Sequence, residues 1–179
     1  MSDQAPTIGS RFSETFFQFL AFTPDEPEFN WRTFDFNTDP DRVTIREILD
    51  AVDPDLSSFH ARGGKMITHF GWSDTALNPM MSVSYYENVQ ATLGADTTSD
   101  FYRLFMVPGM FHCRGGLGTD RFDVMTPLIN WVEAGIPPDT IPAARVEDEA
   151  VSRTRPLCPY PQVAAYTGEG SIDDATNFV

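Results

Sequence analysis

Hydrophobic positions along the chain predict short strands that alternate with helices. Two short apolar runs, 65–70 and 101–107, have the character of strands. Between them, residues 79–93 place apolar side chains along one side of a helix, and Gly94 is well placed to end it. Strands that alternate with helices argue for a parallel sheet covered on both faces. The pattern therefore predicts the α/β class, with a short parallel sheet and flanking helices.

Three further helices are predicted before the first strand. Residues 11–22 form a short amphipathic helix, whose aromatic face we expect to pack on the rest of the molecule. Thr44 opens a helix that runs to Val52, and Glu47 follows three residues later as in a capping box. Residues 56–62 form another short helical piece. The aromatic face of the first helix consists of Phe12, Phe16, Phe19 and Leu20.

The C-terminal half predicts one more helix and then little regular structure. Residues 95–100 are expected to form a polar loop, and residues 120–134 a helix that ends at Gly135. From Ile136 onward the chain is proline-rich and is expected to be largely irregular, with one strand near 144–146. The side chains expected to face inward on the last helix are Phe122, Met125, Leu128, Ile129 and Val132.

Two strands make a poor sheet, because a doubly wound domain normally has more. The chain is therefore expected to be the end of an α/β domain whose earlier strands are absent. Its 179 residues suit one domain or a large piece of one, and 41% hydrophobic residues are ample for a core.

Charge and apolar content restrict the partners. The formal net charge is -14, so the phosphate backbone of a nucleic acid would be repelled and nucleic acid is not an expected partner. No apolar stretch approaches the roughly 20 residues that span a bilayer, so no membrane partner is expected. Residues 1–10 are polar and lack the basic and apolar segments of a signal peptide.

The candidate chemistry lies at the carboxyl ends of the two predicted strands. Asp74 follows the first strand and His112 follows the second, with one crossover helix between the strands. In open parallel sheets sites form outside these ends, so the two side chains are expected to meet. An aspartate beside an imidazole fixes its tautomer and stabilises the imidazolium when the other nitrogen takes a proton.

Each of these residues also has an ordinary structural interpretation. An aspartate after Gly-Trp-Ser is often a turn residue or a helix cap, and a histidine at a turn is commonly a hydrogen-bonding loop residue. The other histidines are weaker candidates: His69 lies inside a strand and His60 in a short helical piece. Only the positions of Asp74 and His112 at successive strand ends favour catalysis.

The cysteines leave several states open. Cys113 and Cys158 can pair with each other, stay free, or pair with cysteines elsewhere. The chain has no CxxC or CxxH spacing, so a structural zinc site is not predicted. Cys113 beside His112 suggests a thiol nucleophile, but adjacent residues on a tight loop usually point apart. No Gly-x-Ser-x-Gly elbow is present, so the nucleophile of an α/β-hydrolase is missing.

Several blocks together resemble the C-terminal part of the tannase and feruloyl esterase family, from about Phe29 to the end. The resemblance implies a serine esterase of α/β-hydrolase fold with a large inserted lid, acting on galloyl or hydroxycinnamoyl esters. It implies Asp74 as the acid and His112 as the base of a catalytic triad. The blocks are Gly63-Gly-Lys-Met-Ile, Gly71-Trp-Ser-Asp74, Tyr85-Tyr86, Phe101-Tyr-Arg-Leu-Phe-Met-Val-Pro-Gly-Met-Phe-His-Cys-Arg-Gly-Gly116 and Arg153-Thr-Arg-Pro-Leu-Cys-Pro-Tyr-Pro161.

The same resemblance carries expectations about cysteines, metal and location. Cys113 matches a cysteine that is disulfide-bonded beside the nucleophilic serine, and Cys158 matches one bridged near the C-terminus. The family's calcium site belongs to the lid, so no cofactor or metal is expected in this chain. Members are mostly secreted or periplasmic.

These expectations combine into one functional hypothesis and one alternative. Residues 1–41 are expected to be an aromatic helix and a return segment from the lid, and residues 42–179 the C-terminal part of the catalytic domain. The chain then carries the acid and base of a phenolic-ester hydrolase without its serine, and is inactive alone. Alternatively it is a non-catalytic fragment, which complements a serine-bearing fragment or forms a homodimer through its exposed sheet edge and aromatic N-terminal helix.

Overall fold

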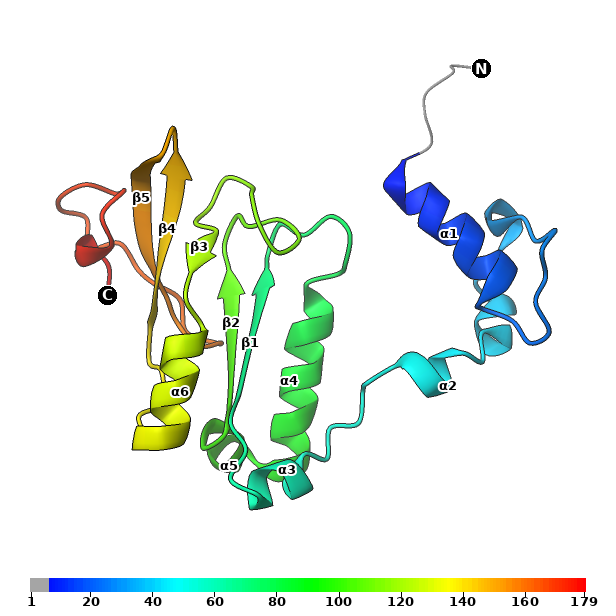
Figure 1. Ribbon diagram of the computed structural model, residues 1–179, viewed down its shortest axis with the longest axis horizontal. Helices are drawn as coiled ribbons and strands as arrows, with labels where there is room; N and C mark the ends of the chain where they lie inside the picture. The colour runs from blue at the N-terminus through cyan, green and yellow to red at the C-terminus, as the bar shows by residue number, and fades with distance from the viewer. Residues whose placement is uncertain (1–6) are drawn as a thin grey trace. The chain divides into compact units, whose positions relative to one another are not determined.

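The computed structural model describes residues 7–179, which form two compact units that divide between Val52 and Asp53. Figure 1 shows both units along the chain. Each unit is described by itself below. The boundary expected from the sequence lies at residues 41 and 42, and the assignment of the first part to a lid stays a prediction.

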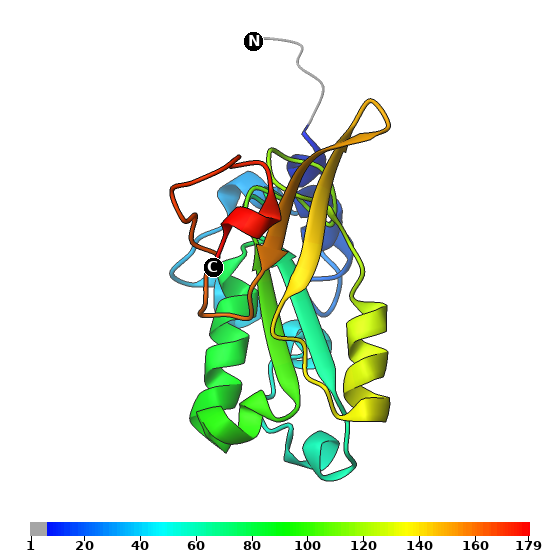
Figure 2. The same ribbon diagram turned by 90° about the vertical axis from the view of Figure 1, so that its left-hand side faces the viewer.

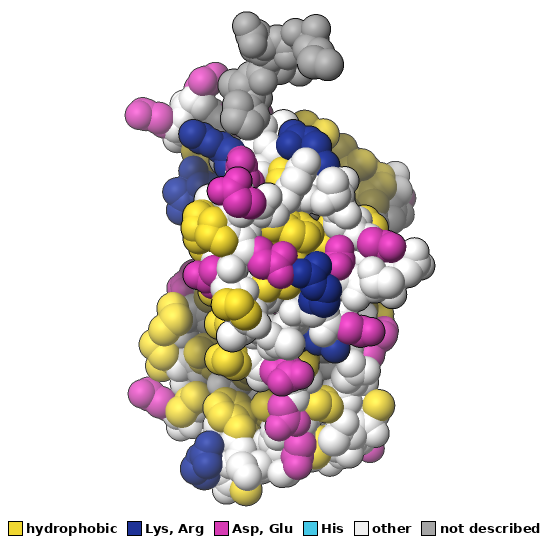
Figure 3. Space-filling model, turned by 90° about the vertical axis from the view of Figure 1, so that its right-hand side faces the viewer, with side chains coloured by type: hydrophobic (Ala, Val, Ile, Leu, Met, Phe, Trp, Pro, Cys, Tyr) yellow, Lys and Arg dark blue, Asp and Glu magenta, His cyan; other side chains and the backbone are white. Residues whose placement is uncertain are grey.

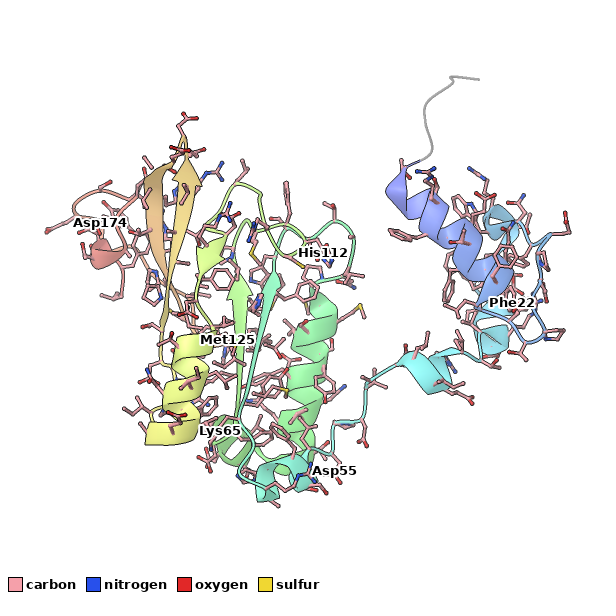
Figure 4. The ribbon with its side chains drawn as sticks, in the orientation of Figure 1. Phe22, Asp55, Lys65, His112, Met125 and Asp174 are labelled. Carbon is pink, nitrogen blue, oxygen red and sulfur yellow. The ribbon has the colours of Figure 1, made fainter. Side chains whose placement is uncertain are left out.

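The first unit is built around an aromatic cluster. Helix α1 (Ile8–Phe19) begins with Thr7, whose side chain accepts a hydrogen bond from the Ser10 amide. Phe17 packs against Phe22, Phe29 and Phe34, with ring centroids 4.9–6.0 Å apart. The guanidinium of Arg42 lies 4.4 Å from the centre of the Phe22 ring, which Figure 4 labels. Two 3₁₀ turns, η1 (Trp31–Thr33) and η2 (Asp39–Arg42), complete this cluster.

Within this unit the face expected to pack on the rest of the molecule is mostly exposed, and only Phe16 of its four members is half-buried. The expectation for the next helix is wrong. Helix α2 is a single turn, Arg46–Leu49, and its start has no capping side-chain bond. The chain leaves the helical conformation at Asp50, whose ψ is 110°.

The second unit contains the predicted parallel strands. Strands β1 (Met66–Gly71) and β2 (Tyr102–Val107) pair in parallel, with Met66 opposite Tyr102 and Gly71 opposite Val107. Helix α4 (Met80–Leu93) connects them and ends at Gly94, which has a φ of 89°. Both strands and this helix lie where the hydrophobic pattern predicts them.

Helices cover both faces of this small sheet. Figure 2 shows α4 on one face and α6 (Met125–Ala134) on the other. Short helix α3 (Ser57–Ala61) precedes β1, and α5 (Ala95–Ser99) stands where a polar loop was expected. The core residues of β2 alternate between two clusters: Tyr102, Leu104 and Met106 pack with α4, and Phe105 and Val107 pack with the C-terminal strands.

The C-terminal region has more regular structure than the sequence predicts. Strands β4 (Ile141–Glu147) and β5 (Ala150–Leu157) form an antiparallel hairpin, which β3 (Arg121–Phe122) extends. The hairpin turn, Asp148-Glu149, has positive φ at both residues. Beyond β5 the tail is irregular apart from the 3₁₀ turn η3 (Ala175–Asn177).

Helix α6 starts later than predicted and buries a different face. Its first turn is capped by Asp123, which accepts hydrogen bonds from the amides of Met125 and Thr126. Pro127 then falls in the first turn, where a missing N–H costs nothing. Trp131 is the buried residue of this helix, whereas the side chains of Met125, Ile129 and Val132, expected to face inward, are exposed.

Acidic side chains are spread among hydrophobic ones on the face shown in Figure 3, in keeping with the net charge of -14. Among the helices of residues 7–179, none has the length and apolar character that a membrane span requires.

Candidate active site

The structure brings Asp74 and His112 together at the carboxyl ends of β1 and β2. Nδ1 of His112 lies 2.8 Å from Oδ2 of Asp74, a hydrogen-bonding distance. Figure 4 shows His112 in the loops beyond these strand ends and Lys65 at the opposite end of the sheet. The expected meeting of the two side chains is thus observed, and their catalytic role stays a prediction.

Asp74 is held as a buried, ionised acceptor. Its side chain is 2% exposed, and its Oδ1 accepts hydrogen bonds from the amides of Ala76 (2.7 Å) and Leu77 (2.9 Å). Burial alone would raise the pKa of Asp74, but the bonds from Leu77, His112 and Ala76 outweigh it and hold this pKa below its ordinary value. The second oxygen is therefore left, negatively charged, for the imidazole.

The imidazole of His112 is open on its other side. Its side chain is 53% exposed, and Nε2 has no hydrogen-bond partner within residues 7–179. An ionised Asp74 accepts a hydrogen bond from Nδ1–H of the neutral ring. The lone pair of that ring is then on Nε2, which is free to accept a proton. This arrangement can take a proton from a hydroxyl group placed at Nε2 and return it to a leaving group.

His112 lies on a loop that folds back on itself between residues 108 and 118. The amide of Gly118 donates to the carbonyl of Gly109 at 3.1 Å, and Met110 and Gly116 form an isolated antiparallel bridge. A Cβ at Gly116 would lie 2.0 Å from the Gly109 oxygen, so a side chain there is excluded. The close approach of the two limbs explains the glycines of this segment.

The aspartate loop packs directly on the histidine loop, backbone against backbone. Trp72 and Ser73 donate their amides to the carbonyls of Val107 and Met110. A Cβ at Gly71 would lie 2.3 Å from the Met110 oxygen and 2.6 Å from the Phe111 oxygen. Gly71 therefore sets the separation between the loops. The sequence pattern points only to Asp74 in this segment, because the need for glycine at position 71 depends on a contact with the histidine loop.

Neither cysteine is paired in the part of the chain that the structure describes. Cys113 is exposed, with a φ of 62°, and Cys158 is half-buried, so the two do not form the Cys113–Cys158 disulfide that was one of the open states. Burial raises the pKa of the Cys158 thiol, which disfavours its reactive thiolate. No hydrogen bond joins Cys113 to His112 among the described side chains, so nothing in the geometry favours a thiol nucleophile.

The other two histidines lie apart from this pair. His60 is half-buried and its ring stacks on that of Phe101, with the ring centroids 4.9 Å apart. The rings of His69 and Phe122 are nearly perpendicular with centroids 5.1 Å apart, and burial lowers the pKa of the His69 imidazole. Its Nδ1 is buried without a partner among the described residues.

A cavity opens beside the two loops. It has a volume of about 450 Å³ and is lined by Trp72, Pro108 and Leu117 from the loops and by Arg155 and Cys158 from β5 and its end. His112 does not line it. Across residues 7–179, no group of three or more His, Cys, Asp or Glu side chains is placed to hold a metal ion.

Comparison with known proteins places the chain among esterases. The family model described as tannase and feruloyl esterase matches residues 8–179. A mono(2-hydroxyethyl) terephthalate hydrolase from Piscinibacter sakaiensis is 45% identical over 157 residues, which are 81% of this chain and 26% of that protein. A probable feruloyl esterase B-1 from Aspergillus flavus is 32% identical over 167 residues, 81% of this chain and 32% of that protein.

Comparison of the fold with solved structures also relates the chain to esterases. The crystal structure of an esterase from Aspergillus oryzae superposes with a TM-score of 0.83 at 28% identity, covering 92% of this chain and 36% of that one. The predicted fold class, the C-terminal portion of an α/β-hydrolase, is confirmed. The chain spans about a quarter to a third of the length of the curated relatives it matches.

Proposed function

Because the chain belongs to the tannase and feruloyl esterase family, we propose that it supplies the acid and the base of a serine carboxylic ester hydrolase. The observation that carries the proposal is the 2.8 Å contact between Nδ1 of His112 and a buried, ionised Asp74, with Nε2 left open. This is the arrangement of the two non-nucleophilic members of a catalytic triad.

The proposed reaction needs a serine that the chain does not provide. The serine Oγ attacks the ester carbonyl as His112 Nε2 takes its proton, and Asp74 accepts the Nδ1 proton of the resulting imidazolium in a hydrogen bond. His112 then gives the proton to the leaving alcohol, and water, activated in the same way, releases the acid and restores the serine. The chain has no Gly-x-Ser-x-Gly segment, so the serine comes from residues outside it.

The proposed substrates are esters of aromatic acids. The names of the two relatives specify a terephthalate ester and feruloyl esters as what those proteins act on, and a solved structure with a TM-score of 0.70 at 25% identity is a tannin acyl hydrolase from Aspergillus niger. Each of these acyl groups carries an aromatic ring. Galloyl and hydroxycinnamoyl esters are the first substrates to test.

The test is reconstitution with the missing part of a relative. The chain is mixed with a fragment of the Piscinibacter sakaiensis hydrolase that covers the region this chain does not match, and turnover of methyl ferulate, methyl gallate and mono(2-hydroxyethyl) terephthalate is measured. The chain alone should show no turnover. His112→Ala should lower the kcat of the mixture on the order of 10⁶-fold, the scale found when a triad histidine is removed.

His60→Ala is the matched control, because His60 lies on α3, at the opposite end of the unit from the site, and should leave the kcat of the mixture unchanged. Full activity of the His112→Ala mixture would contradict the proposed role of His112. Robust turnover by the chain alone, lost in His112→Ala, would contradict the need for an added serine.

A non-catalytic assembly role is favoured by one specific observation. Within residues 7–179, strand β1 pairs only with β2, so the backbone groups on its other edge have no strand partner. An unpaired edge is a template for another strand. A fragment that binds the chain without producing His112-dependent turnover would support this second candidate over the first.

A further inference from the structure

Two arginines of the β4–β5 hairpin donate hydrogen bonds to the backbone of the histidine loop. Nη1 of Arg145 lies 2.5 Å from the carbonyl oxygen of Gly116 and 3.5 Å from that of Gly118. Nη1 of Arg153 lies 3.1 Å from the carbonyl oxygen of Leu117. Three consecutive carbonyls of the segment that returns from His112, residues 115–118, are therefore bound by guanidinium groups.

The two arginines stand opposite each other across the hairpin, an arrangement that is unfavourable without compensation. Arg145 pairs with Arg153 in the register of β4 and β5, and like charges directly opposite one another destabilise a sheet. Each is compensated by a carboxylate: Arg145 by Glu147 at 2.9 Å and Arg153 by Asp173 at 2.6 Å. Each guanidinium group therefore contacts both a carboxylate and the backbone of the histidine loop.

The return segment has few other interactions that fix it. Besides its antiparallel bridge to Met110 at Gly116, its bonds are from the Gly115 amide to Asp120 at 2.8 Å, from the Phe111 amide to the Gly115 carbonyl at 3.1 Å, and from the Gly118 amide to the Gly109 carbonyl. Cys113, next to His112, adopts a positive φ that a non-glycine residue disfavours. A loop with this backbone and only one isolated bridge between its limbs needs support from its surroundings to hold one conformation.

We propose that Arg145 and Arg153 are positioning residues that hold the histidine loop so that Nδ1 of His112 stays on Asp74. The proposal rests on the proposed function, since it concerns the same acid–base pair. Neither arginine hydrogen-bonds the imidazole of His112 among the described residues. They act through the carbonyls of Gly116, Leu117 and Gly118, which fix the return limb of the loop whose other limb is bound to the aspartate loop.

The experiment reads the tautomer of His112 and needs no turnover. Long-range ¹H–¹⁵N correlation spectra of the full chain, recorded at alkaline pH where imidazoles are neutral, distinguish the Nδ1–H from the Nε2–H form. His112 is assigned by its loss in His112→Gln. The unaltered chain should show a single Nδ1–H pattern, and Asp74→Asn should show the averaged pattern of an unpaired ring.

The decisive variant is Arg145→Met combined with Arg153→Met, which should lose the Nδ1–H pattern and match Asp74→Asn. Arg155→Met is the matched control: Arg155 also lies on β5 and 4.0 Å from Asp173, but it bonds the Thr154 carbonyl, stacks on Phe178 and makes no hydrogen bond to the histidine loop, so the pattern should stay that of the unaltered chain. Arg153→Lys, which keeps the charge beside Asp173, should restore part of the signal lost in Arg153→Met.

A double variant that keeps the pattern of the unaltered chain overturns the proposal. If the double variant does not fold, as judged by its amide spectrum, the two single Met variants decide: unchanged tautomer patterns in both overturn the proposal, and partial loss in each supports it. Failure of the proposed hydrolase function would appear in the reconstitution assay with the tautomer pattern intact, so the two failures are distinguishable.

Discussion

At the scale of single residues, Asp74 divides its two carboxylate oxygens between two tasks. Oδ1 accepts the amides of Ala76 and Leu77, which shapes the loop, and Oδ2 faces His112. The carboxylate is thus both a turn residue and the partner of the imidazole. The structural and the catalytic interpretations of this aspartate, which compete when only the sequence is considered, hold together in one side chain.

This arrangement makes stability depend on pH through Asp74. Its folded pKa is lowered, so its contribution to the free energy of unfolding is fully present above the unfolded pKa, about 3.9, and is lost as pH falls through the folded value. Asp74→Asn should therefore be less stable than the unaltered chain at neutral pH, with the difference shrinking in acid. Urea unfolding across a pH series measures this, and a difference that stays constant down to strong acid would contradict it.

Gly71 is the residue whose substitution should separate the two loops. In Gly71→Ala the added methyl would meet the carbonyl oxygens of Met110 and Phe111, so the loops must move apart. Overpacking of this kind costs about 1–3 kcal/mol, and urea unfolding should show a loss of that size. Gly9→Ala is the control, because nothing lies within 4 Å of a Cβ there. Equal stability of the two variants would count against a tight contact at Gly71.

At the scale of elements, hydrophobic periodicity predicts the bounds of a helix or strand well when its apolar side chains pack against elements adjacent in the chain. The strands β1 and β2 and the helix α4 lie within one residue of their predicted bounds, because each apolar face packs inside one strand–helix–strand unit. Strand β5 was missed because Pro142 and Pro156 face each other in the β4–β5 ladder, and proline ordinarily argues against a strand.

Helix α6 shows why the spacing of apolar residues does not determine which face of a helix is buried. Its sequence offers an apolar stripe of Met125, Ile129 and Val132, but the sheet side takes Trp131. The Trp131 ring lies 5.2 Å from the guanidinium of Arg103 and 5.4 Å from the ammonium of Lys65, so it packs beside two cations of the sheet. A helix that is apolar on more than one side leaves the choice to its surroundings.

Substitutions on the two sides of α6 should therefore differ sharply in cost. Trp131 is 3% exposed, so Trp131→Ala should lower the free energy of unfolding by about 3–5 kcal/mol. Val132→Gln, on the exposed side, should change it by less than about 0.5 kcal/mol. Urea unfolding followed by far-UV circular dichroism measures both. A large loss in Val132→Gln would mean that this stripe is covered in solution.

At the scale of the whole molecule, the candidate site was accessible from sequence because it lies at strand ends. The order of strands and helix places Asp74 and His112 at one edge of the sheet, and the structure brings them to 2.8 Å. The support of the histidine loop by Arg145 and Arg153 was not accessible, because it depends on a hairpin register that the sequence does not show. Contacts between elements that are distant in the chain could not be predicted from the sequence.

The division into two units predicts that each can be weakened by itself. Arg42 holds the first unit together: its guanidinium lies over Phe22 and pairs with Glu26 and with Asp39, the latter at 2.8 Å. These interactions lie within residues 7–52, so Arg42→Met should lower the denaturant midpoint of the first unit and leave that of the second unchanged. Without the Arg42 cation, the negative charges of Glu26 and Asp39 are no longer compensated, and the contact with the Phe22 ring is lost. Both changes lower the stability of the first unit.

Tryptophan fluorescence separates the two transitions, because Trp31 lies in the first unit and Trp72 and Trp131 lie in the second. The difference between curves of the unaltered chain and of Trp31→Phe isolates the first unit, and the Trp31→Phe curve reports the second. Arg62→Met, in the second unit, is the matched control and should not move the Trp31 transition. A single midpoint that shifts equally for all three tryptophans in Arg42→Met would show that the units unfold as one, and that the boundary at Val52 is not a boundary of stability.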